Sequence, residues 1–266
     1  MFTQHRSLLL GVLGCTDVLI KNSEFAEWGV IGQTKQGGPA IHVASHEQNR
    51  APSQGISIVR NHLHDGEWVA ISIYGQHVRI NQNLIERIHE SGIYAFGHRR
   101  GDFATDYAAD VNVLNNVVSH VRVKDISATG IEIASDCAVI SGNKIIDTDS
   151  SGIKIIGGGN RTSVTDNTII DSVSRPDIFH THGQITIQSG DSAPGTLYDI
   201  IVERNTVLDD RSPKLAPYAI AVPAWRGSKR IHHAVVKAND LSHGYALAPL
   251  FVAPDIVGSD SSIGDP

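Results

Sequence analysis

The stretches Val113-Leu-Asn-Asn116-Val-Val118 and Ile140-Ser-Gly-Asn143-Lys-Ile145 are two copies of one short pattern, apolar-x-x-Asn-x-apolar. Seven copies carry the asparagine, and an eighth, weaker copy, Ile20-Lys-Asn-Ser23-Glu-Phe25, carries serine in its place. Self-similarity of this kind, with a minimum interval and longer intervals elsewhere, indicates a repeated coil that takes insertions. The remaining asparagine copies centre on Asn61, Asn83, Asn167, Asn205 and Asn239.

A second pattern precedes most copies of the first: a small residue followed by apolar-x-apolar. Gly130-Ile131-Glu-Ile133 and Gly152-Ile153-Lys-Ile155 are examples. Alternation of this period predicts β-strands with one buried and one outward face. Each coil is therefore expected to contain three short strands, and the coils must stack because one coil alone cannot bury its apolar side.

The asparagine of each copy is predicted to sit at a tight bend, where its backbone can adopt a left-handed conformation. Its side-chain amide can also reach the backbone of the next coil. The sequence therefore predicts a buried ladder of asparagines, with a structural role, running along the stack.

Composition excludes several classes of protein. The chain has 266 residues, of which 41% are hydrophobic and 19% charged, so a folded core is expected. Its net charge of −6 argues against a nucleic-acid-binding protein, which would need a basic surface. No apolar run reaches the roughly 18 residues that span a bilayer. The apolar run Leu8-Leu-Leu-Gly-Val-Leu-Gly-Cys15 is interpreted as part of the fold rather than as a signal segment.

Together these repeats resemble the right-handed parallel β-helices of the pectate-lyase-like superfamily. The resemblance covers about residues 7–253 and implies an all-β, single-stranded solenoid of about nine coils. Residues 1–257 are predicted as the β-helix domain and residues 258–266 as a loose polar tail. The resemblance also implies carbohydrate-active relatives, namely lyases, epimerases and hydrolases, alongside non-catalytic repeat proteins, and an extracellular or periplasmic location. A homo-oligomer, or a place within a longer chain, is also compatible with it.

In the resembled superfamily, the substrate groove follows the first strand of successive coils. The outward residue of that strand should form one column, with neighbours about 5 Å apart. Tyr94, Glu132 and Lys154 are then side by side, and we predict that they form a catalytic cluster; a surface ion pair between Glu132 and Lys154 is the alternative. The whole predicted column is His42, Ser72, Tyr94, Glu132, Lys154, Thr186 and Ala221.

Elimination or epimerisation at a uronic acid needs a base for the proton next to the carboxylate, and elimination needs a donor for the leaving oxygen. Lys154 or Tyr94 is the predicted base, with the other or His98 as the acid. Arg99 and Arg100 are predicted to clamp the substrate carboxylate, because guanidinium binds it through two hydrogen bonds. Further substrate contacts are predicted at His42, His180, His182 and Thr186.

Two alternatives use the same groove. A glycoside hydrolase would need two carboxylates about 5–9.5 Å apart, for which Glu132 with Asp147 or Asp149 is the candidate pair. Asp147 and Asp149 are also the candidate ligands of a Ca²⁺ ion, with ordinary turn formation as the other interpretation. A non-catalytic module that binds glycans or serves as a structural stalk is the third class.

Overall fold

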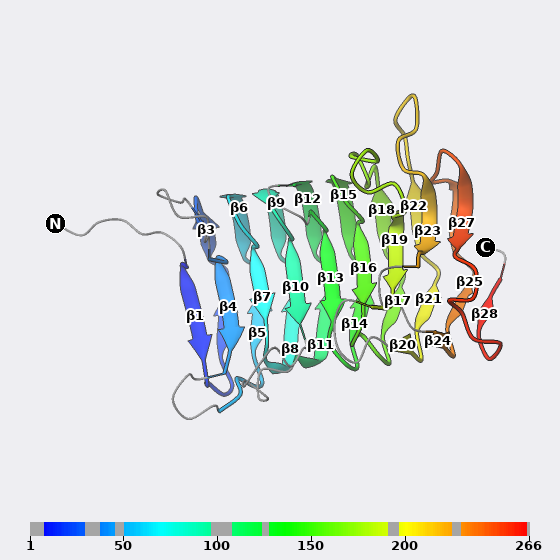
Figure 1. The fold of residues 1–266 in the computed structure, drawn as a ribbon. Helices are drawn as coiled ribbons and strands as arrows, with labels where there is room; N and C mark the ends of the chain where they lie inside the picture. The colour runs from blue at the N-terminus through cyan, green and yellow to red at the C-terminus, as the bar shows by residue number, and fades with distance from the viewer. Residues whose placement is uncertain are drawn as a thin grey trace.

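The computed structural model describes residues 8–29, 38–45, 51–96, 108–123, 128–190, 197–224 and 230–264. In these ranges the chain forms short strands joined by bends and turns, with no helix and hence no membrane-crossing helix. All strand pairs are parallel, and each strand within a long sheet, apart from the two at its ends, pairs with its counterparts one coil earlier and one coil later. The described chain is therefore a solenoid of stacked coils (Figure 1).

Three long sheets run along the solenoid. We name them sheets A, B and C in the order in which a coil visits them. Figure 1 shows sheet A along the whole stack, from its blue to its red end. Its strands are β1 (Leu10–Leu13), β4 (Ile41–Ala44), β7 (Ile71–Ile73), β10 (Ile93–Phe96), β13 (Ile131–Ala134), β16 (Ile153–Ile156), β19 (Gly183–Gln188), β23 (Tyr218–Val222) and β27 (Ala248–Val252).

Sheets B and C complete each coil. Sheet B contains β2 (Leu19–Lys21), β5 (Ser57–Val59), β8 (Gln76–Asn81), β11 (Ala109–Leu114), β14 (Val139–Ser141), β17 (Ser163–Thr165), β21 (Ile201–Glu203), β25 (Val235–Lys237) and β28 (Ser262–Ile263). Sheet C contains β3 (Glu24–Ala26), β6 (His62–Gly66), β9 (Leu84–His89), β12 (Val117–Arg122), β15 (Lys144–Thr148), β18 (Thr168–Ile170), β22 (Thr206–Leu208) and β26 (Asp240–His243). A small fourth sheet pairs β20 (Leu197–Tyr198) with β24 (Ile231–His232).

The core is a set of aliphatic columns, as the alternating pattern predicts. In sheet A, Ile131 pairs with Ile93 on one side and with Ile153 on the other, and all three side chains are fully buried. Stacking identical branched side chains between coils removes apolar surface from water without a change of shape along the axis. The predicted three-strand coil is confirmed, and the run from Leu8 contains strand β1, as expected.

The predicted asparagine ladder is confirmed. Asn116 donates from its side-chain nitrogen to Oδ1 of Asn143 at 3.0 Å and to the carbonyl of Ile80 at 3.0 Å. Asn143 in turn donates to Oδ1 of Asn167 at 2.9 Å and to the carbonyl of Val113 at 2.8 Å. The same bonds run from Asn61 to Asn239, and every ladder asparagine is at least 96% buried.

One detail of the predicted bend is wrong. The left-handed backbone lies on the residue before each ladder position, as at Gln82 with φ of 58° and Asp166 with φ of 58°. At most copies this residue is not glycine, and Gly142 is an exception. The ladder asparagine itself is left in an ordinary conformation, so its side chain is free to bond between coils instead of stabilising a turn.

The chain after residue 257 also differs from the prediction of a loose tail. Ser262 and Ile263 form β28, which pairs in parallel with Val235 and Val236 of β25. Ser261 Oγ accepts a hydrogen bond from the backbone N–H of Ala234 at 3.0 Å. The segment was predicted to be loose because it is mostly polar, but its one apolar residue in β28, Ile263, continues sheet B.

Candidate functional site

The outward column predicted on sheet A is confirmed by the strand register. Glu132 of β13 pairs with Tyr94 of β10 and with Lys154 of β16. The column continues through Ser72 and His42 on one side and through Thr186 and Ala221 on the other. The three predicted catalytic side chains therefore occupy three consecutive strands at one height on the sheet.

This face is more enclosed than an open sheet surface. The exposed fraction of Glu132 is 8%, Ser72 is also buried, and Tyr94 and Lys154 are half-buried. A carboxylate with so little water contact carries a desolvation cost unless neighbouring groups stabilise it. Ser91 Oγ lies 3.5 Å from Oε2 of Glu132 and is one such group. The prediction of an exposed column was wrong, because each column residue from Ser72 to Thr186 is either buried or half-buried.

Thr186 is placed in the column as predicted, but it is fully buried. Its hydroxyl lies 2.8 Å from Ser151 Oγ and accepts a hydrogen bond from the backbone N–H of Gly183 at 3.1 Å. These bonds hold the hydroxyl against its own chain, so Thr186 shapes the strand and does not offer a surface contact to a substrate.

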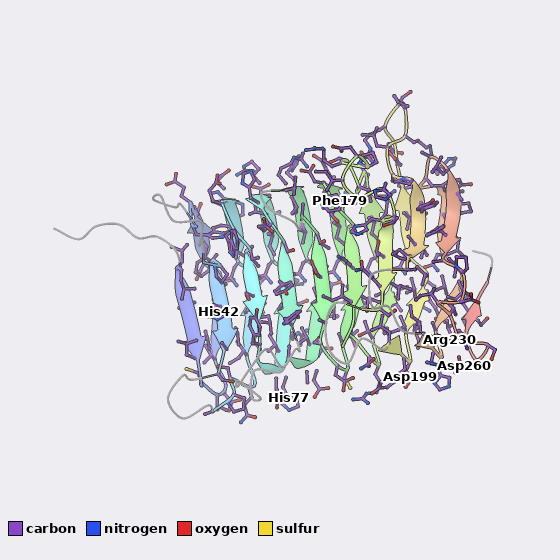
Figure 2. All side chains as sticks on the ribbon, viewed as in Figure 1. His42, His77, Phe179, Asp199, Arg230 and Asp260 are labelled. Atoms are coloured by element: carbon purple, nitrogen blue, oxygen red, sulfur yellow. The ribbon has the colours of Figure 1, made fainter. Side chains whose placement is uncertain are left out.

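Aromatic rings cover sheet A beside the polar column. Tyr94 stacks on Phe96 with ring centroids 5.3 Å apart. Phe96 meets Tyr74 edge-on at 6.1 Å, and Tyr74 meets His42 at 5.6 Å. Tyr74 and Phe96 were missed by the sequence analysis, although each follows a column residue by two positions and must share its outward face. These contacts join the rings into a row from β4 to β10, and Figure 2 labels His42 at its first end.

On the other side of the cluster, His182 is packed at the edge where the strands of sheet A begin. Its ring stacks on Phe179, which Figure 2 labels, with centroids 5.2 Å apart, and Ser150 Oγ lies 3.0 Å from its Nδ1. Burial lowers the pKa of His182 to about 3, and the positive charges of Lys154 and His180 add to the effect. His182 is therefore neutral at pH 7 and is a weak base, whereas His180 is exposed.

Three predicted residues lie outside the described ranges: His98, Arg99 and Arg100. Their expected roles as acid and carboxylate clamp stay predictions.

The predicted Ca²⁺ ligands are occupied by protein groups. Asp147 forms a two-pronged ion pair with Arg122. Asp149 accepts hydrogen bonds from the backbone N–H of Val123 at 2.9 Å and from Ser174 Oγ at 2.6 Å. Arg122 also lies 3.6 Å from Asp149. The two carboxylates thus fix the end of sheet C, and their arrangement favours the interpretation as structural corner residues.

A different set of side chains has metal-binding geometry. Within the described part of the chain, Glu24, His62 and His64 each offer one ligand atom, and these atoms lie within 4.8 Å of one another. They come from β3 and β6 on the outer face of sheet C. This set was not predicted, because Glu24 and His62 are 38 residues apart in the sequence. Each of the two directly follows a ladder position, and this shared place in the repeat was the available signal.

Comparison with known proteins places this architecture. The family model described as "Right handed beta helix region" matches residues 7–169. Among solved structures, the chain resembles the A-module of the mannuronan C-5 epimerase AlgE6 from Azotobacter vinelandii, with a TM-score of 0.56 and 14% sequence identity. That likeness covers 94% of this chain and 59% of the A-module, so the chain spans less than two thirds of that relative.

The A-module of the mannuronan C-5 epimerase AlgE4 from the same organism matches with a TM-score of 0.40 and 13% identity, over 96% of this chain and 78% of that one. No curated protein matches the sequence. At these identities the likeness to solved structures is a likeness of fold.

Proposed function

We propose that this chain, which belongs to the right-handed β-helix family, binds and modifies a uronate-containing polysaccharide on the outer face of sheet A. Each coil of the solenoid adds one side chain to a column on that face. The observation that carries the proposal is the row of Tyr94, Glu132 and Lys154 on consecutive strands beside a continuous aromatic surface. The reaction we propose is lyase or C-5 epimerase chemistry, and an extracellular or periplasmic location goes with it.

The aromatic row supports sugar binding. Flat rings with apolar faces pack against the C–H faces of sugars, and the polar tips of Tyr74 and Tyr94 can bond to hydroxyls. The row extends over three strands, so it spans about 10 Å across the sheet. Where Tyr94 is the base, Lys154 keeps its positive charge and, two strands beyond the last ring of the row, would attract the carboxylate of a uronate despite the net charge of −6.

Both proposed reactions begin with the same step. A base removes the proton at C-5, next to the carboxylate, and the electron pair moves toward the carboxylate carbon. In elimination, that pair forms the double bond between C-4 and C-5 while the bond from C-4 to the leaving oxygen breaks, and an acid protonates that oxygen. In epimerisation, C-5 takes a proton back on its opposite face, and no bond of the sugar chain breaks.

Lys154 and Tyr94 are the proposed proton carriers, one as the base in its deprotonated form and the other as the acid. Glu132 lies between them and is the proposed positioning residue, because a buried carboxylate can hold an ammonium or a hydroxyl in one orientation. His182 is a neutral, buried group near the Lys154 end of the cluster, since the charge of Lys154 contributes to its low pKa.

Within the described residues, nothing favours the hydrolase alternative, since Asp147 and Asp149 are bonded to Arg122, Val123 and Ser174. A non-catalytic glycan-binding module is the second candidate, because the aromatic row alone is sufficient for binding.

The test is an activity screen of the full chain against alginate, polygalacturonate and glycosaminoglycans, with and without Ca²⁺. Ultraviolet absorbance follows the unsaturated product, a reducing-end assay follows hydrolysis, and NMR follows inversion at C-5. We expect unsaturation or inversion, lost in Lys154→Ala and Tyr94→Phe and retained in Lys144→Ala and Tyr198→Phe. Binding without any product would support the glycan-binding module, and reducing ends without unsaturation would contradict the proposed chemistry.

A further inference from the structure

The outer face of sheet C carries an acid and two imidazoles in close contact near one end of the solenoid. Glu24 of β3 pairs in register with His62 of β6, and His64 follows on the same face of β6 because Leu63 between them points into the core. The imidazole centroids are 4.3 Å apart. Glu24 Oε1 lies 2.9 Å from Nε2 of His64. One ligand atom from each residue lies within 4.8 Å of the others.

A second carboxylate fixes the orientation of His64. Asp65 Oδ2 lies 2.6 Å from Nδ1 of His64, which leaves Nε2 directed at Glu24. Arg87 holds Asp65 in place through two hydrogen bonds, from Nε at 2.7 Å and from Nη2 at 3.0 Å. An acid on the far nitrogen of a histidine is the usual support of a metal-ligating imidazole, since it fixes the tautomer and the ring orientation.

His62 has equivalent support. Its Nε2 lies 3.0 Å from Oε1 of Glu86, and Arg87 Nη1 lies 2.7 Å from the same oxygen. Arg87 therefore bridges the two acids that orient the two histidines. These outer groups are largely exposed, with 48% of the Arg87 side chain and 45% of the Asp65 side chain accessible, so their pairing adds little to stability. Their arrangement is better explained by the orientation of the imidazoles.

We propose that Glu24, His62 and His64 bind one divalent transition-metal ion, with Arg87 as a positioning residue that acts through Asp65 and Glu86. Two imidazoles and one carboxylate suit Zn²⁺, and three protein ligands leave a coordination position open for water or another ligand. A depression of about 480 Å³ is lined in part by Glu24, His62 and Arg60. Bound metal would join β3 to β6 and so stabilise the first coils. This site is separate from the proposed function on sheet A.

The test is isothermal titration of the metal-free full chain with Zn²⁺, with Mg²⁺ as a hard cation that this ligand set should bind poorly. We expect one Zn²⁺ per chain, a rise in the unfolding temperature on binding, and loss of binding in His64→Ala. Glu24→Gln removes a ligand at an exposed position and so tests the site even where His64→Ala perturbs the fold. His120→Ala, on β12 of the same sheet, is the matched control and should bind as the wild type does.

Arg87→Ala separates positioning from ligation. We expect Zn²⁺ affinity to fall by about 10- to 100-fold, with partial recovery in Arg87→Lys. The absorption spectrum of the Co²⁺-loaded protein should also change, while the unfolding temperature of the metal-free variant stays that of the wild type. Absence of Zn²⁺ binding by the wild type, or equal binding by wild type, Glu24→Gln and His64→Ala, would overturn the proposal.

Discussion

Sheets A and C are built on the same coils, but their outer faces carry ionisable groups in different ways. On sheet C, acids and bases bond to one another across the strands: Arg87 lowers the pKa of Asp65 well below its usual range, and Arg122 pairs with Asp147. On sheet A, Glu132 is 92% buried in a line with Tyr94 and Lys154, beside stacked rings. The ion pairs on sheet C hold individual side chains in fixed orientations, whereas the column and rings on sheet A form an extended surface.

The difference indicates which face binds an extended ligand. Exposed ion pairs change the free energy of unfolding little, so at most positions on sheet C they need no functional explanation. A buried carboxylate beside aromatic rings carries a desolvation cost unless neighbouring groups stabilise it. This contrast agrees with the polymer site that we propose on sheet A and the metal site that we propose on sheet C.

The largest effect on stability is expected for the asparagine ladder, which joins the coils that carry both faces. Asn143→Ala removes the acceptor of the Asn116 backbone and side-chain N–H groups, and it leaves both donors buried. We expect a loss of about 3 kcal/mol or more in the free energy of unfolding. Asn112→Ala, at a half-buried position outside the ladder, should change it by less than about 0.5 kcal/mol. Equal losses in chemical denaturation would mean that the ladder does not hold the coils together.

The second prediction separates the two faces. Glu132→Gln keeps the shape of the side chain but removes its charge, and we expect activity on the polysaccharide to fall about 100-fold. The amide keeps an oxygen that can accept a hydrogen bond from Ser91, so the variant should remain folded, which chemical denaturation checks. Glu203→Gln, on sheet B, should retain activity, and both variants should bind Zn²⁺ normally. Full activity of Glu132→Gln would remove Glu132 from the site.

The third prediction concerns the edge of sheet A. Burial, Lys154 and His180 hold the pKa of His182 at about 3 in the folded state, against 6.5 for an ordinary histidine. Between these values the unfolded chain binds one more proton than the folded chain, so stability rises with pH. Relative to His182→Asn, which can still accept a bond from Ser150, the wild type should lose about 1.4 kcal/mol per pH unit as the pH falls below 6.5. Parallel pH–stability curves for the two proteins would show that His182 is not buried as described.

The smallest effect is expected for an exposed ion pair outside both faces. Arg204 donates to Asp166 from Nε at 2.9 Å and from Nη2 at 3.0 Å, at a corner open to solvent. Arg204→Ala should leave the midpoint of chemical denaturation unchanged within error in high salt, and activity unchanged at any salt concentration. A large shift would mean that surface charge pairs do stabilise the solenoid, and the functional argument from sheet C would weaken.

The repeat made much of the fold predictable. One asparagine per coil located the ladder, and the alternating pattern around Glu132 and Lys154 placed the sheet A column in the correct register. The backbone of the bend was less predictable, because the left-handed residue carries many residue types, Gln82 and Asp166 among them. Strand β28 was missed for a different reason: its single apolar residue, Ile263, gives no periodic pattern.

For the site, the sequence predicted which residues share a strand face but not how deeply they are buried. Strand alternation shows which residues face outward, but not what covers them, so the burial of Glu132 and Thr186 was missed. Pairing between coils also decided the role of Asp147, whose partner Arg122 lies 25 residues away. The contact between Glu24 and His64 depends in the same way on how adjacent coils align.

The most direct test of the polymer site is a crystal structure of the protein with a bound uronate oligosaccharide. The account predicts sugar rings against Tyr74 and Tyr94 on sheet A, with a uronate carboxylate within hydrogen-bonding distance of Lys154. Sugar bound on sheet B or C, with the sheet A face empty, would contradict it.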